Sequence, residues 1–96
     1  MNGMQIVLLI KNFGGRLTGS YARQEEHGNS DFDFYIPERR WEKFIQAAPK
    51  DFESCICGHV AWRTEDLGLV EASCLFKRQN VAIKEREILG QVWKLW

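Results

Sequence analysis

Residues 17–36 read LTGSYARQEEHGNSDFDFYI, and this stretch holds the densest grouping of chemistry-bearing side chains in the sequence. Gly19 and Ser20 end a short predicted strand and open a helical turn, where free backbone N–H groups and the positive end of a helix hold a phosphate. Arg23 lies one turn further along and adds positive charge for the same anion. A Gly-Ser turn can also serve only to reverse the chain. Whether it indicates a phosphate site therefore depends on the strand that follows.

That strand is predicted over 31–36, where acidic and aromatic residues alternate. Because successive side chains point to opposite faces of a strand, Asp31 and Asp33 share one face, about 6.5–7 Å apart along the backbone. Two carboxylates at this spacing can converge on Mg²⁺, a hard cation that takes one or two carboxylates together with substrate phosphates. The competing interpretation is an edge strand with a solvated acidic face.

The segments GSYAR at 19–23 and SDFDF at 30–34 resemble the Gly-Ser plus Asp-x-Asp motif of the DNA polymerase beta-like nucleotidyltransferase superfamily. They are most similar to the minimal nucleotidyltransferases of prokaryotes and their phages, and the predicted elements come in the order of that family. The chain departs from the family at one point of this motif. Many small members carry a glycine after the arginine-containing segment, where this chain has Gln24.

The resemblance implies specific roles for the motif residues. Gly19 and Ser20 are expected to contact the phosphates of ATP or another nucleoside triphosphate, with Arg23 assisting. Asp31 and Asp33 are expected to bind Mg²⁺ or Mn²⁺.

Members of the family also use a third acidic residue on a later strand, flanked by apolar residues. Glu71, in the segment LVEAS at 69–73, is the best match to that description. The catalytic and metal-binding set implied by the resemblance is therefore Asp31, Asp33 and Glu71. The other interpretation of Glu71 is an outward-facing residue of an ordinary strand.

The activity implied is in-line transfer of a nucleotide from ATP or another nucleoside triphosphate to an acceptor hydroxyl. Small members of that family resemble antitoxins that modify a partner toxin. The most concrete activity that the resemblance implies is therefore AMPylation of a HEPN-type toxin or a host protein. The alternative is a catalytically silent protein of the same fold, of phage or toxin-antitoxin type, that acts by protein–protein contact.

The rest of the chain predicts a single nucleotidyltransferase-like domain over 1–96. Its fold class is α/β (α+β), in two layers, with a mixed or antiparallel sheet of about four or five strands and two or three helices on one face. Beyond the central stretch, apolar periodicity predicts helices over 1–13 and 38–48 and strands over 54–62, 67–76 and 80–84. The segment 85–96 suits either a helix or a strand.

Composition narrows the class of partner and compartment. Thirteen Lys and Arg balance thirteen Asp and Glu among 96 residues, so the overall charge does not favour nucleic acid or an anionic membrane surface. Three cysteines are too few for a disulfide-stapled secreted domain and favour a reducing, cytoplasmic setting. The longest apolar run is far shorter than the roughly 20 residues of a membrane span.

Cys55, Cys57 and His59 alternate within the strand predicted over 54–62, which would place all three on one face. A zinc site there is conceivable, although buried free cysteines are favoured because no second pair of ligands is present in the sequence. Cys74 is also expected in the core.

His27 and the C-terminal tryptophans are weaker candidates. His27 precedes the two aspartates and either contacts phosphate or acts in proton transfer, or is simply solvated in its loop. Trp93 and Trp96 cluster at the end of the chain. They are expected to form an exposed apolar surface for a partner protein or a homodimer, the alternative being a lid over the thin core.

Overall fold

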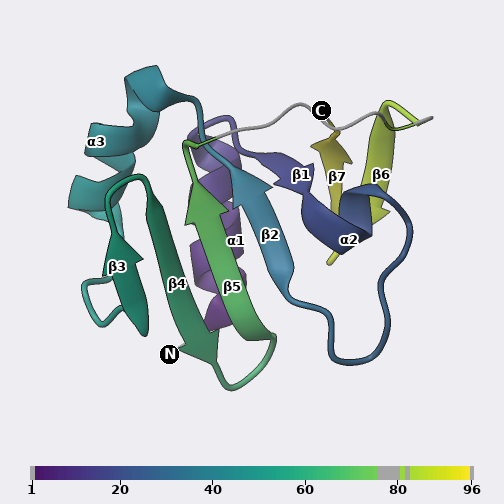
Figure 1. Ribbon diagram of the computed structural model, residues 1–96, viewed down its shortest axis with the longest axis horizontal. Coiled ribbons are helices and arrows are strands. Elements are labelled where there is room, and N and C mark those ends of the chain that lie inside the picture. The colour runs from purple at the N-terminus through teal and green to yellow at the C-terminus, as the bar shows by residue number, and fades with distance from the viewer. Residues whose placement is uncertain (1, 76–80, 82, 96) are drawn as a thin grey trace.

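A mixed five-stranded sheet, covered on one face by helices, forms the body of the structure (Figure 1). The computed structural model describes residues 2–75, 81 and 83–95. The described helices and strands are, in chain order, α1 (Gly3–Asn12), β1 (Arg16–Thr18), α2 (Gly19–Ala22), β2 (Phe32–Tyr35), α3 (Glu38–Ala47), β3 (Ser54–Ile56), β4 (His59–Thr64), β5 (Gly68–Ser73), β6 (Glu85–Ile88) and β7 (Gln91–Lys94).

The strand order in the sheet is β1-β2-β5-β4-β3, and β6 and β7 form a separate hairpin. β2 and β5 run parallel, while the other neighbours in the sheet pair antiparallel. The α+β class with a mixed sheet of five strands is therefore confirmed. No helix in the described ranges is both long enough and apolar enough to span a membrane.

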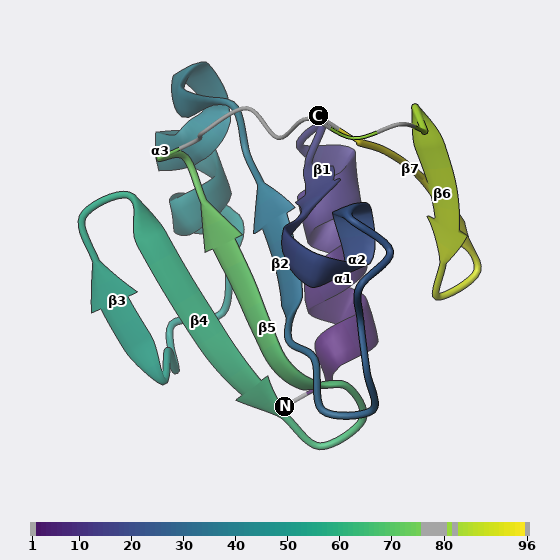
Figure 2. The same ribbon diagram turned by 45° about the vertical axis from the view of Figure 1, so that its right-hand side comes forward.

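The face of the sheet that meets the helices is set by the alternation in β2. Phe32 and Phe34 are buried, whereas Asp33 and Tyr35 on the other face are only half-buried, as the sequence predicts. Helices α1 and α3 both cover the apolar face (Figures 1 and 2). The core between the layers includes the fully buried side chains Ile6, Val7, Ile10, Phe34, Phe44, Val60, Trp62 and Val70.

Helix α1 begins where two side chains satisfy its first backbone N–H groups. The Asn2 side chain accepts from the Gln5 N–H at 3.2 Å, so Asn2 caps the helix. Asp66, in the β4–β5 turn, accepts from the N–H groups of Gly3 and Met4 at 2.6 and 3.1 Å. Gly3 fits because a Cβ there would lie only 2.7 Å from the Thr64 hydroxyl. The helix is thereby attached to the turn at the far end of the sheet.

The strand predicted over 54–62 is wrong in its continuity, because the chain turns within it. β3 ends at Ile56, Cys57 and Gly58 form the turn, and β4 begins at His59. Gly58 has φ of +79°, a conformation that glycine adopts without steric cost. The turn breaks the alternation that would have placed Cys55, Cys57 and His59 on one face.

The cysteine predictions are corrected accordingly. Cys55 and Cys57 are exposed rather than buried, since they lie on the short edge strand and its turn. Cys74 is half-buried, and burial raises the pKa of its thiol. Within the described residues no group of three or more His, Cys, Asp and Glu side chains is gathered closely enough for a metal ion, so the zinc site is not formed.

The end of the chain is a hairpin and not a helix, which settles the two options for 85–96 up to residue 95. Gly90, with φ of +74°, forms the turn between β6 and β7. The strand predicted over 80–84 is wrong at its described positions, because Val81, Ile83 and Lys84 are not in a strand. Residues 80 and 82 lie outside the described residues.

Trp93 lies in the core, so the exposed surface expected there is wrong. Its side chain is 1% exposed and packs on Phe34, with 4.6 Å between ring centroids. The Lys11 ammonium lies 4.9 Å from the Trp93 ring and donates a hydrogen bond to the Val92 carbonyl. Trp93 therefore fills part of the thin core from the hairpin. Because its side chain is buried there, it is not available for a dimer surface. Trp96 lies outside the described residues.

Replacing Asp66 by Ala is expected to lower the stability of the fold at neutral pH. Hydrogen bonds from the Gly3 and Met4 N–H groups hold the pKa of Asp66 below its ordinary value. The folded state therefore gains stability from this carboxylate above about pH 4, and the gain is lost as the pH falls through the folded-state pKa. Urea unfolding followed by circular dichroism should show a difference from wild type that narrows in acid.

The matched control is Asp51→Ala, which removes an exposed carboxylate with no hydrogen bond within the described residues. An Asp66→Ala unfolding curve that coincides with wild type at pH 7 would contradict the capping role.

Candidate functional site

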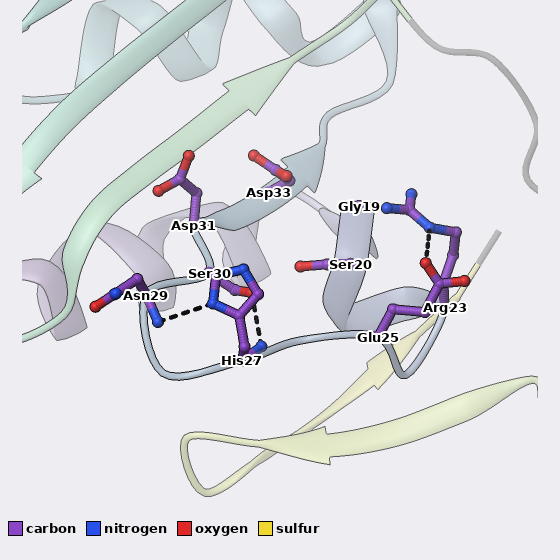
Figure 3. Close-up of a pocket in the computed structure, with 9 residues that line it drawn as sticks. All are labelled: Gly19, Ser20, Arg23, Glu25, His27, Asn29, Ser30, Asp31 and Asp33. Atoms are coloured by element: carbon purple, nitrogen blue, oxygen red, sulfur yellow. Dashed lines mark hydrogen bonds and ion pairs between the residues drawn. The ribbon is translucent and has the colours of Figure 1, made fainter.

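A polar pocket of about 490 Å³ opens between α2, the loop after it and the start of β2 (Figure 3). It brings together five of the six site residues that the sequence predicts, and it adds polar residues of the loop. The lining residues are Gly19, Ser20, Arg23, Glu25, His27, Asn29, Ser30, Asp31 and Asp33.

Gly19 allows the start of α2 to lie directly against Asp33. β1 pairs antiparallel with β2 so that Thr18 faces Asp33, and the chain turns into α2 immediately afterwards. Gly19 has φ of +69°, and a Cβ at this position would lie 2.3 Å from the Asp33 Oδ2 atom. Any other residue would therefore be strained and would displace the carboxylate. The Gly-Ser turn and the Asp-x-Asp strand are thus one packed unit.

Glu71 is the sixth predicted residue, and the parallel pairing of β2 and β5 places it beside Asp33. The two residues are direct partners in the register, and their carboxyl groups share a hydrogen bond. Asp31 is exposed just before β2 begins, and Figure 3 shows its carboxyl on the same side of the strand as that of Asp33. The three acids lie on the face of the sheet opposite α1 and α3, and among the described residues they are not gathered closely enough to count as a group that could hold a metal ion.

The electrostatics of this arrangement centre on Asp33. Burial, the hydrogen bond with Glu71 and the negative charges of Glu71 and Asp31 together raise the pKa of Asp33 to about 8. The positive charge of Arg23 acts in the opposite direction. At neutral pH and without a cation, the Asp33 carboxyl therefore holds a proton next to Glu71.

His59 is a neighbour of this site that the sequence reasoning places elsewhere. Its Nε2 atom lies 3.4 Å from Glu71 Oε1. The contact arises because β4 pairs with β5 in a register that sets His59 opposite Ser73, two residues from Glu71. Only the pairing of these strands, which no local motif specifies, could have indicated it.

The loop after α2 begins with a residue in an uncommon backbone conformation. Gln24 has φ of +57°, in the left-handed region that glycine favours. The chain therefore makes the turn that a glycine would make there, at the steric cost of a side chain. Arg23, one residue earlier, forms an ion pair with Glu25 at 3.3 Å on the rim of the pocket.

Arg86 of β6 holds this loop from outside. Its guanidinium donates to both oxygens of Glu26, at 2.6 Å to Oε1, and to the Tyr21 carbonyl at 2.8 Å. These hydrogen bonds lower the pKa of Glu26 to about 2, so the pair stays charged across the neutral range. Sequence reasoning misses Arg86, because sixty residues separate it from Glu26 and no spacing connects them.

No family model, curated protein or solved structure matches this chain. The site offers carboxylate oxygens, with backbone and hydroxyl groups opposite them.

In EDTA, which removes divalent cations, the Asp33→Asn variant is expected to be more stable to unfolding than wild type at alkaline pH. Because the folded-state pKa of Asp33 is raised above its ordinary value, the wild type loses stability as the pH rises from about 4 to about 8. The variant lacks that loss. For a half-exposed site, we expect an advantage of about 1–2 kcal/mol at pH 8 and little at pH 5.

Urea unfolding in EDTA at the two pH values measures this difference, with Asp51→Asn as the exposed control. Parallel pH dependences for Asp33→Asn and wild type would contradict the proton held at Asp33.

Arg86→Met is expected to loosen the loop without unfolding the sheet, because it removes the bridge to Glu26 and keeps an apolar stem of similar length. Hydrogen exchange measured by mass spectrometry should quicken in peptides covering 23–30 and stay unchanged in those covering β4 and β5. Arg39→Met, on the exposed face of α3, is the matched control. Equal protection of 23–30 in both variants would show that the bridge does not order the loop.

Proposed function

We propose that this protein is a Mg²⁺-dependent nucleotidyltransferase that uses ATP or another nucleoside triphosphate. The observation that carries the proposal is the contact of Gly19 with Asp33, with Glu71 paired to Asp33 from the neighbouring strand. This contact joins a backbone turn suited to phosphate with carboxylates suited to a divalent cation. The sequence motif and the resemblance point to the same residues.

The paired carboxyls of Asp33 and Glu71 supply the kind of oxygen donors that a hard divalent cation takes, although they and Asp31 are not gathered closely enough in the described structure to form a three-ligand site. The Asp33–Glu71 pair holds a proton because its negative charges lie close together. A divalent cation that displaces this proton would be bound by the carboxylate oxygens. Asp31, Asp33 and Glu71 are the residues that would hold Mg²⁺ or Mn²⁺. When bound, such an ion neutralises charge on the phosphates and favours ionisation of an acceptor hydroxyl.

The chain's own residues have separate tasks in this proposal. Gly19 and Ser20 bind phosphate oxygens with backbone N–H groups and the Ser20 hydroxyl, and Arg23 adds positive charge at the rim. The half-buried position of Asp33 keeps its carboxyl in one place against Gly19, so the phosphates and the acceptor meet at a fixed distance from it. Transfer joins the acceptor oxygen to the α-phosphorus, breaks the bond from that phosphorus to the bridging oxygen, and releases pyrophosphate and the acceptor proton.

The acceptor is inferred from the resemblance alone. A hydroxyl on a partner protein, such as a HEPN-type toxin or a host protein, is the form that the small relatives imply. Because the pocket is open and lies at the edge of the sheet, a protein side chain could reach it without a change in the fold (Figure 3).

Asp33→Asn and Glu71→Gln should each reduce nucleotide transfer by at least about 100-fold, because each removes a charge that acts on the reacting groups. Asp51→Asn should be unaffected. Transfer of radiolabel from [α-³²P]ATP to protein in a bacterial lysate, with Mg²⁺ and then with EDTA, measures the activity. Labelling by Asp33→Asn at the wild-type level would contradict the assignment.

Calorimetry with Mg²⁺ and ATP separates this proposal from the alternative of a silent binding protein. We expect a binding heat with wild type that is lost in the Asp31→Ala/Asp33→Ala double variant. Negligible heats in both would contradict the transferase and favour action by protein contact. The exposed edge strand β3, where Ile56 is 66% exposed, is the observation that favours this second function.

A further inference from the structure

The loop between α2 and β2 holds the imidazole of His27 in one orientation. Its Nδ1 atom accepts a hydrogen bond from the Asn29 N–H at 3.2 Å. The His27 N–H donates to the Ser30 hydroxyl at 2.8 Å, and the Ser30 N–H donates to the His27 carbonyl at 3.0 Å. Three hydrogen bonds within four residues thus close a tight turn, and the two that involve side chains are drawn in Figure 3.

These contacts decide which ring nitrogen carries the hydrogen. A nitrogen that accepts a hydrogen bond has no hydrogen of its own, so we assign the hydrogen of the neutral ring to Nε2. Figure 3 shows Nε2 on the side of the ring away from Asn29, directed into the pocket toward the side where Asp31 and Asp33 lie. Within the described part of the chain, no protein group accepts from it.

The loop is also fixed at the residue before His27. Glu26 forms the two hydrogen bonds with Arg86 of β6, whose partly buried guanidinium also binds the Tyr21 carbonyl. Tyr21 in turn stacks on Phe32, with 4.5 Å between ring centroids. These contacts connect the chain before His27 to the hairpin and to β2, while the exposed imidazole itself is held by its hydrogen bond from Asn29.

We propose that His27 is a further substrate-binding residue, which donates its Nε2 hydrogen to a phosphate oxygen of the nucleotide. The proposal rests on the function proposed above. The phosphates proposed above would lie in this same pocket, and an ionised phosphate offers only hydrogen-bond acceptors to the Nε2 hydrogen. Triphosphate oxygens are such acceptors, whereas a nucleobase edge also presents donors.

The test compares His27→Ala with His27→Gln. The glutamine amide can place an N–H near the position of Nε2, so it should retain binding within about threefold of wild type. Alanine has no donor and should weaken Mg²⁺-ATP binding about tenfold, measured by calorimetry. Thermal unfolding of each variant confirms that the fold persists, since a loss caused by unfolding would affect both substitutions.

Magnesium tripolyphosphate, used as a competitor of ATP, identifies the part of the nucleotide involved. If His27 contacts phosphate, His27→Ala should weaken tripolyphosphate binding by the same factor as ATP binding. A loss for ATP alone would place the contact on the base or sugar and overturn the proposal.

The outcome also separates this inference from the proposed function. Wild-type protein that binds ATP, with His27→Ala binding equally well, would overturn the role of His27 and leave the transferase standing. Wild-type protein that binds neither ATP nor tripolyphosphate would overturn both.

Discussion

The carboxyls of Asp33 and Glu71 lie side by side, and most of the site is arranged around this unfavourable contact. Like charges in a half-buried position repel, and the protein tolerates them by holding a proton there. The backbone encloses the pair through the parallel register of β2 and β5 and through a glycine turn that only a residue without a side chain can make. Such an arrangement costs stability, and sites that do so are where function is expected.

Local sequence is sufficient where each element is specified by its own residues. The alternation in β2, the helix over 38–47 and the turn at Gly19 all follow from spacing and from turn chemistry within a few residues. It is insufficient where the decision is made elsewhere in the fold. The spacing of Cys55, Cys57 and His59 fits the alternation of a continuous strand, yet the chain turns at Gly58 between β3 and β4. Trp93 is expected on an exposed apolar surface near the end of the chain, yet it is buried and packs on Phe34 of β2.

The site shows the same division. Glu71 is expected from the resemblance, as the acidic residue with apolar neighbours on a later strand, and the register sets it opposite Asp33. Arg86 and His59 escape prediction, because their contacts join segments whose distance in space is fixed only after the sheet and hairpin have packed. Charge complementarity across sixty residues has no signature in a single sequence.

The C-terminal hairpin has a consequence for how the molecule can be divided. All six motif residues lie before residue 75, yet Trp93 and Leu95 occupy part of the core, and Leu95 bridges to Leu17 of β1. A fragment that ended after β5 would keep the motif and lose the packing beneath β2. The hairpin and the sheet that carries the motif are therefore expected to fold as one cooperative unit. The C-terminal segment contains no motif residue, yet the motif residues depend on it for their folded positions.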